Sequence, residues 1–167
     1  MEYISSDTNV WIDFKAISRL DLPFLLPYTY IMYEESMQSE LLSPAGFYQE
    51  LTEAGLIGID ITYDEFFLAE SWGEKYPRLS VQDRIALAIA KSRRIFLLTG
   101  DGALRKAAHR EGVNVIGTLG ILDKLYNDLY ISPEIYRDCL QGLQNHNGVD
   151  VRLPQDELAR RLNSLEG

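Results

Sequence analysis

The chain has 167 residues, of which 46% are hydrophobic and 25% are charged. This balance is that of one ordinary globular domain, and it excludes disordered, collagen-like and low-complexity chains. The longest apolar run is the six residues 85–90, well short of the ~20 that a membrane-spanning helix needs. The first ten residues lack the basic and apolar regions of a signal peptide, and Cys139 is the only cysteine. We therefore expect a single cytoplasmic domain over residues 1–167, without a disulfide or a cysteine-based zinc site.

The net charge of −9 arises from 16 basic and 25 acidic residues. Taken alone, this charge argues against a polyanionic partner. The charge is unevenly distributed, however, because residues 1–79 carry a balance of −10, residues 80–130 one of +3 and residues 131–167 one of −2. The middle segment is therefore the part of the chain whose charge suits nucleic acid.

In the first half, short β-rich runs alternate with amphipathic stretches. Ser43-Pro44 is typical of a helix start and Gly55 of a helix end. Thr62 and Glu65 have the spacing of a capping box. The predicted strands span residues 3–6, 28–32 and 58–61. The predicted helices span residues 10–20 and 34–42, the segment between Ser43-Pro44 and Gly55, and residues 62–76.

The second half repeats the alternation of helices and strands. The predicted helices span residues 81–92, 103–111 and 121–130, a segment opened by Ser132-Pro133, and residues 155–165. The predicted strands span residues 94–98 and 113–116. Strands separated by helices imply crossover connections and a parallel sheet with helices on both faces. The predicted fold class is α/β.

Acidic residues follow two of the predicted strands. Asp7 comes directly after the first strand, and Asp101 follows the fourth, between Gly100 and Gly102. In parallel α/β sheets, ligands bind at the carboxyl ends of the strands. Two carboxylates brought together there would repel each other unless a cation lay between them, which favours a divalent metal.

Each acid also has a purely local interpretation. Asp7 could cap the following helix, and Asp101 could serve the turn that its flanking glycines permit. Asp83 lies three residues after Ser80, which is the spacing of a capping box. Glu40 lies on a predicted helix that already carries other solvated acids.

Several segments taken in order are more specific than any single acid, and they resemble those of PIN-domain ribonucleases over about residues 4–143. The resemblance extends to the toxin-type members and to a subfamily of bacterial and archaeal PIN-like proteins. The matching segments are SDTNV at 6–10, SELL at 39–42, LSVQD at 79–83, LLTGDGALRKAA at 97–108 and VIGTLGIL at 115–122.

This resemblance implies a three-layer α/β/α sandwich with a central parallel sheet of four to five strands. Residues 144–167 would form an extra C-terminal helical extension. It also implies a metal-dependent endoribonuclease, often the toxin of a toxin–antitoxin pair and often a homodimer, with RNA as substrate and a small antitoxin protein as a possible partner. The family carboxylates map onto Asp7, Glu40, Asp83 and Asp101, which would hold one or two Mg²⁺ or Mn²⁺ ions that polarise the phosphodiester and activate water.

The resemblance to PIN-domain ribonucleases also implies roles for residues other than the four acids. Asn9 and Thr99 match polar positions that support bound water or substrate in the family. The acid of the second helix could instead be Glu34 or Glu35, because the proline that often precedes this helix is absent. The basic residues in positions 84–110 could line the rim of an RNA cleft, and we expect this role chiefly of the two nearest the acids, Arg84 and Arg105. Alternatively, these bases could form salt bridges with the acidic first half.

Two other functions compete with the nuclease. A phosphatase of the haloacid-dehalogenase type would use Asp7 as its nucleophile, but it needs a second aspartate where this chain has Asn9. A catalytically silent PIN-like module would bind RNA or protein without cleaving it. The presence of all four acids argues against the silent module.

Overall fold

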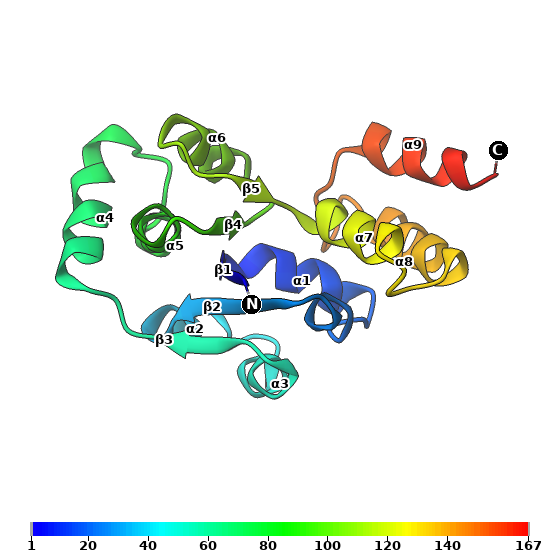
Figure 1. Ribbon diagram of the computed structural model, residues 1–167, viewed down its shortest axis with the longest axis horizontal. Coiled ribbons are helices and arrows are strands. Elements are labelled where there is room, and N and C mark those ends of the chain that lie inside the picture. Colours follow the sequence, from blue (N-terminus) through cyan, green and yellow to red (C-terminus); the bar gives the residue numbers. More distant parts are fainter. Residues whose placement is uncertain (1, 167) are drawn as a thin grey trace.

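The computed structural model describes residues 2–166. The centre of the protein is a five-stranded, fully parallel sheet with the strand order β3-β2-β1-β4-β5. Figure 1 shows this sheet surrounded by helices. The strands are β1 (Glu2–Ser6), β2 (Tyr28–Tyr33), β3 (Ile57–Ile59), β4 (Phe96–Leu98) and β5 (Val115–Ile116). The chain order reverses at β1, so that β2 and β4 lie on either side of it. Ligands of open parallel sheets bind at such a switch point.

Helices connect the strands and continue beyond the last one. They are α1 (Thr8–Ala16), the 3₁₀ helix η1 (Leu22–Leu25), α2 (Glu34–Glu40), α3 (Phe47–Ala54), α4 (Tyr63–Lys75), α5 (Val81–Arg93), α6 (Gly102–Arg110), α7 (Thr118–Asn127), α8 (Pro133–His146) and α9 (Gln155–Glu166). None of the helices between residues 2 and 166 has the length and apolar character needed to cross a membrane.

Each face of the sheet carries its own hydrophobic core, because side chains of a strand alternate between its two faces. Ile4 and Tyr30 face a core built with α1, α3, α7 and α8. Ile31 and Leu97 face a second core built with α4, α5 and α6. The protein is therefore an α/β/α sandwich, as the sequence predicted. Helix α8 buries Cys139 and Leu143 in the first core, where α9 adds Leu158.

The local signals identify most elements correctly and fail in a few places. Both capping boxes are present, at Thr62 with Glu65 and at Ser80 with Asp83. The predicted helix start at Ser43-Pro44 is wrong. Helix α3 begins at Phe47, because the chain first turns through Gly46, whose φ of 83° is left-handed.

Further differences concern element boundaries, and among them β3 and β5 are shorter than the predicted strands 58–61 and 113–116. The first helix covers residues 8–16 instead of 10–20, and a 3₁₀ helix that was not predicted follows it. The fourth strand begins at Phe96 instead of Arg94, because Arg94 has a left-handed φ of 57° and ends α5. Helix α7 begins at Thr118, three residues before its predicted start.

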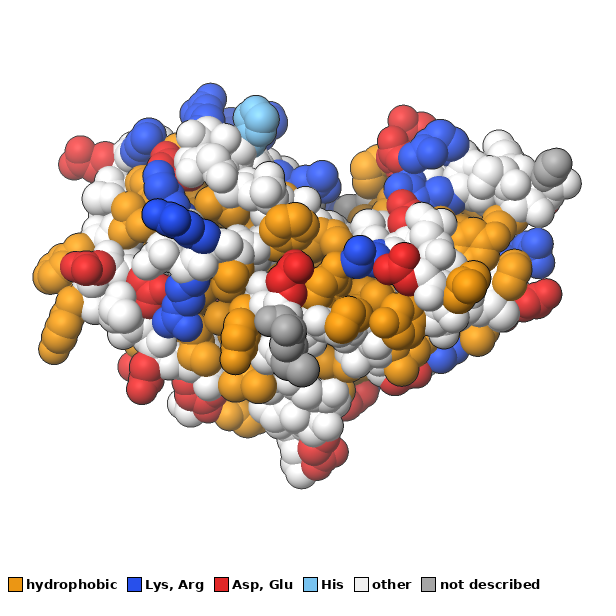
Figure 2. All heavy atoms as spheres, viewed as in Figure 1, with side chains coloured by type: hydrophobic (Ala, Val, Ile, Leu, Met, Phe, Trp, Pro, Cys, Tyr) orange, Lys and Arg blue, Asp and Glu red, His pale blue; other side chains and the backbone are white. Residues whose placement is uncertain are grey.

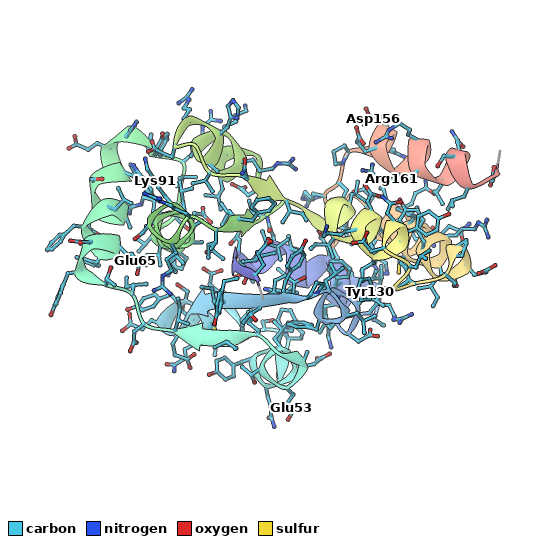
Figure 3. All side chains as sticks on the ribbon, in the orientation of Figure 1. Glu53, Glu65, Lys91, Tyr130, Asp156 and Arg161 are labelled. Carbon is cyan, nitrogen blue, oxygen red and sulfur yellow. The ribbon has the colours of Figure 1, made fainter. Side chains whose placement is uncertain are left out.

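A buried carboxylate holds α4, α5 and the end of α6 together. Lys91 of α5 donates to Glu111 at 2.6 Å, and Lys75 of α4 donates to the same carboxylate at 2.9 Å. Figure 3 labels Lys91 on α5, beside α4. Burial raises the pKa of Glu111, but hydrogen bonds from Lys91, Tyr76 and Lys75 outweigh burial and hold that pKa at about 2.

Glu111→Gln is expected to lower the free energy of unfolding by about 2 kcal/mol at neutral pH, because two cations lose a buried partner. Since the folded-state pKa of Glu111 lies below its ordinary value of 4.5, its stabilisation is complete above about pH 4.5 and is lost as the pH falls towards 2. Urea unfolding at several pH values measures the difference. The exposed Glu74→Gln serves as control, and an equal stability of both variants at neutral pH would refute the role of Glu111.

Candidate functional site

The site begins at the carboxyl end of β1, the central strand. Asp7 follows β1 directly, and its backbone N–H donates to the carbonyl oxygen of Leu98 in β4 at 2.9 Å. Its side chain caps α1, since Oδ1 accepts from the backbone N–H of Thr8 at 2.8 Å. Only 7% of Asp7 is exposed. Asp7 therefore caps α1 and also lies at the carboxyl edge of the sheet.

Thr99, which follows β4, connects Asp7 to the loop that carries Asp101. Its buried hydroxyl donates to Oδ2 of Asp7 at 2.9 Å and accepts from the backbone N–H of Asp101 at 3.1 Å. Asn9 holds the same loop, because its Oδ1 accepts from the N–H of Gly100 at 3.2 Å. Asp101 caps α6 through the N–H of Leu104 at 2.8 Å. These bonds fix the loops after β1 and β4 against each other.

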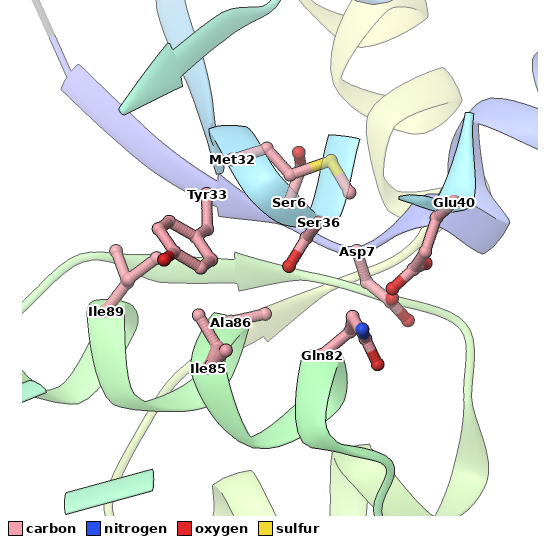
Figure 4. A pocket seen from close by; sticks show the side chains of 10 residues that line it. All are labelled: Ser6, Asp7, Met32, Tyr33, Ser36, Glu40, Gln82, Ile85, Ala86 and Ile89. Atoms are coloured by element: carbon pink, nitrogen blue, oxygen red, sulfur yellow. The ribbon is translucent and has the colours of Figure 1, made fainter. Parts of the chain in front are cut away.

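Glu40, at the end of α2, is the acid of that helix that lies beside Asp7. Its carboxylate accepts a short hydrogen bond from the hydroxyl of Thr8. Both acids line a small pocket, and Figure 4 shows Asp7, Glu40 and Gln82 pointing towards one another. Glu34 instead accepts hydrogen bonds from Tyr48 and Gln38. Of Glu40 and Glu34, it is therefore Glu40 that lies beside Asp7.

Asp83 lies in the first turn of α5, and its carboxylate accepts from the backbone N–H of Ser80 at 3.0 Å. Its local interpretation as part of a capping box is therefore correct. Its charge nevertheless reaches the other acids: it raises the pKa of both Asp7 and Glu40, and Asp101 in turn raises the pKa of Asp83. Asp7, Glu40 and Asp83 thus lie within electrostatic reach of one another, and Asp101 lies within reach of Asp83.

Burial is the main cause of the raised pKa of Asp7, Glu40 and Asp83. It brings the pKa of Asp7 to about 7, with a further contribution from the charge of Asp83, although hydrogen bonds from Thr99 and Thr8 oppose the increase. Burial likewise raises the pKa of Glu40 and Asp83. Between residues 2 and 166, none of the four acids has a lysine, arginine or histidine as ion-pair partner. Among the described residues, no cationic side chain therefore balances the charge that these acids carry when ionised.

The chemistry of these donors suits a hard divalent cation. All four side chains offer carboxylate oxygens, which Mg²⁺ and Mn²⁺ prefer, and a cation would relieve the repulsion among them. No group of three or more His, Cys, Asp or Glu side chains in residues 2–166 converges closely enough to hold an ion directly. Mg²⁺ needs only one or two direct carboxylates and keeps several of its waters. The donor set therefore fits such an ion, with some of the acids acting through water.

The basic residues expected at the rim of the site divide into two groups. Arg84 is directed to α4, where its Nη1 donates to the carbonyl oxygen of Ala69 at 3.1 Å. Arg93 forms a salt bridge with Glu65 of the acidic first half, as the alternative interpretation predicted, whereas Lys91 pairs with Glu111 of the middle segment. Arg105, in contrast, is exposed on α6, and its guanidinium lies close to Gly117. Arg84 is therefore placed for packing against α4, and Arg105 is placed near the site.

Sequence reasoning assigned no role to three residues of this region. Thr8 binds Glu40, while Gln82 and Ser36 line the same pocket as Asp7. Thr8 and Gln82 each neighbour a proposed ligand in the sequence, and this adjacency was the available signal. The contact between Thr8 and Glu40 joins residues 32 positions apart, which no local pattern reveals.

The fold and the site together define an α/β protein with an acidic pocket at the switch point of a parallel sheet. A protein-family model described as a PIN domain matches residues 3–166. The chain therefore belongs to the PIN-domain family. PIN domains are in general nucleases that act on RNA. We found no match to the chain among curated proteins or among solved structures.

Proposed function

We propose that this protein is a metal-dependent endoribonuclease whose acids Asp7, Glu40, Asp83 and Asp101 hold Mg²⁺ or Mn²⁺. The observation that carries the proposal is a set of carboxylates near the switch point of a PIN-domain sheet that have no ion-pair partner between residues 2 and 166. Membership of the PIN family favours this reaction over that of an aspartyl phosphatase. A domain that binds RNA without cleaving it is one possible outcome of the test below.

The residues of the chain have separable tasks in this reaction. A bound divalent ion would polarise the scissile phosphodiester and lower the pKa of water. Thr99 orients Asp7 and fixes the backbone at Asp101, while Asn9 holds Gly100. Thr8 orients Glu40. Arg105 is exposed near the site and would contact a phosphate next to the scissile one.

Cleavage of single-stranded RNA tests the proposal. The purified protein is expected to cut a mixed RNA pool in Mg²⁺ or Mn²⁺, and EDTA is expected to stop the reaction. Asp101→Asn should abolish cleavage yet stay folded, because asparagine caps a helix as well as aspartate does. An RNA pool left intact in both metals would overturn the proposal, and RNA binding without cleavage would then favour the silent module.

Thr99→Val is expected to lower the cleavage rate by roughly 10- to 100-fold, because it removes the hydroxyl that orients Asp7. The loss of both hydrogen bonds should also lower the free energy of unfolding by about 1–3 kcal/mol. Thr99→Ser keeps the hydroxyl and is the matched control. Initial rates of RNA cleavage at saturating Mg²⁺ measure the effect, and equal rates for the valine and serine variants would exclude an orienting role.

The biological setting is a finer proposal that rests on the resemblance. We infer that the protein is a cytoplasmic toxin that acts as a homodimer and is neutralised by a small antitoxin protein. Expression of the chain alone should then arrest growth, and expression of the product of an adjacent small gene should relieve the arrest. Normal growth at a verified level of active enzyme would contradict the toxin role.

A further inference from the structure

A broad groove opens beside the acidic site, between the body of the domain and its C-terminal segment. One wall consists of the start of α6, β5 and the first turn of α7, and the other consists of residues 147–157 and Arg161. Figure 2 shows the corresponding notch in the upper outline, between α6 and α9. Its volume of about 1150 Å³ exceeds the range of roughly 300–1,000 Å³ typical of small-molecule sites. The size therefore favours an extended ligand.

The groove is continuous with the loop that carries Asp101. Gly100 and Gly102, which flank this acid, both line the groove. Asn9 binds the N–H of Gly100 at 3.2 Å, so the start of the groove is fixed relative to α1 and Asp7. A strand lying in the groove would therefore reach the acids at this end.

The free charges in the groove are positive, in a chain whose net charge is −9. Arg105, Lys106 and Arg152 line it and are exposed, and within residues 2–166 they have no ion-pair or hydrogen-bond partner. The acid among the lining residues, Glu157, is neutralised by Arg160 at 2.6 Å and Arg161 at 2.8 Å. The groove therefore suits an anionic chain.

The outer wall is preorganised by hydrogen bonds within the C-terminal segment. The side chain of Asn147 donates to the carbonyl oxygen of Leu153 at 3.0 Å and accepts from its N–H at 2.8 Å. The N–H of Gly148 donates to the carbonyl oxygen of Val151 at 2.7 Å, and Val151 itself is buried. These contacts hold the loop that presents Arg152 to the groove.

We propose that this groove binds the phosphate backbone of single-stranded RNA and leads the strand to the acids, with the C-terminal segment as its outer wall. The proposal rests on the nuclease function proposed above. Among the described residues that line the groove, none is aromatic, so base stacking does not contribute there. Binding in the groove therefore depends on backbone charge and is largely independent of base sequence.

Binding of a labelled RNA tests the groove separately from cleavage. The probe is a fluorescein-labelled single-stranded RNA of about 20 nucleotides, longer than the ~4–16 nucleotides that a single OB-fold domain covers. Fluorescence anisotropy is measured in Mg²⁺ on proteins that carry Asp7→Asn to prevent cleavage. In this background, the pair Lys106→Gln with Arg152→Gln is compared with a control pair, Arg94→Gln with Arg137→Gln, which removes the same charge outside the groove.

The groove pair is expected to weaken binding roughly tenfold and to reduce the slope of log affinity against log salt by about 1.4, because two phosphate contacts are lost at ~0.7 each. The control pair should keep the affinity and the slope of the parent. Equal RNA affinities of the two double variants, or no RNA binding by the Asp7→Asn protein itself, would overturn the proposed RNA-binding role of the groove. If only the groove pair loses affinity, the RNA-binding role of the groove is supported, even if the wild-type protein does not cleave RNA. Absence of cleavage would overturn the proposed nuclease function alone.

Discussion

Asp7→Asn is expected to lower the rate of metal-dependent RNA cleavage by roughly 10²- to 10³-fold, the usual effect of removing one group that stabilises charge in a transition state. Asp7 lies deepest of the four acids, at the end of the central strand. Asparagine has nearly the same shape, and its amide oxygen can still accept the N–H of Thr8, but its NH2 group is a donor and cannot accept the hydroxyl of Thr99 as Oδ2 does. The substitution therefore removes the negative charge and the acceptor for Thr99, while it keeps the size of the side chain and the cap of α1.

Initial rates in Mg²⁺ and in Mn²⁺ measure this loss, and thermal unfolding verifies that the variant is folded. Asp64→Asn is the matched control, because Asp64 lies exposed in the first turn of α4. The control should retain the wild-type rate. If Asp7→Asn also retained that rate, Asp7 would have no part in cleavage and the proposed ligand set would be wrong.

Asp13→Asn is expected to raise the free energy of unfolding by up to about 3 kcal/mol at pH 8. Asp13 lies in α1, only 7% exposed, and accepts a hydrogen bond of 2.6 Å from the hydroxyl of Thr118 at the start of α7. Burial raises the pKa of Asp13 from 3.8 to about 6, although this hydrogen bond lowers it. Ionisation of Asp13 is therefore unfavourable in the folded protein.

The direction of the pKa shift of Asp13 determines how the stability gain of Asp13→Asn depends on pH. The pKa of Asp13 is higher in the folded state than in the unfolded state, so the carboxyl destabilises the fold progressively as the pH rises from about 4 through 6. Asparagine removes that cost and still accepts the hydroxyl of Thr118. The gain should therefore be full at pH 8 and vanish near pH 4.

Urea unfolding over this pH range measures the free energy for the wild type, for Asp13→Asn and for the control Asp138→Asn. Asp138 is exposed on α8, and its replacement should change stability little at any pH. A destabilised Asp13→Asn variant at pH 8 would indicate that the negative charge of Asp13 is required, and would contradict the cost assigned to its burial.

Much of the fold follows from local signals in the sequence. The five strands and the capping boxes at Thr62 and Ser80 depend on residues that are close in the chain. The start of α3 depends instead on the left-handed turn at Gly46, which its neighbours do not signal. The short 3₁₀ helix after α1 carries no hydrophobic period and was therefore missed.

The positions of those candidate site residues that directly follow a strand could be predicted from the sequence. Asp7 and Asp101 each follow a strand of the sheet, so the rule that ligands bind at the carboxyl ends of strands identifies them. The preference for Glu40 over Glu34 rests on the contact with Thr8, which only the structure shows. The direction of Arg84 depends on the packing of α5 against α4. Such contacts join distant segments, and sequence spacing does not encode them.

The termini of the cleaved RNA test the central claim most directly. Hydrolysis by activated water breaks the bond to the 3′-oxygen and leaves a 5′-phosphate and a 3′-hydroxyl. We expect end-labelled single-stranded RNA to yield internal fragments with these ends in Mg²⁺ or Mn²⁺, no fragments in EDTA, and none with Asp101→Asn. Fragments that end in a 2′,3′-cyclic phosphate, or cleavage that persists in EDTA, would contradict metal-dependent hydrolysis at this site.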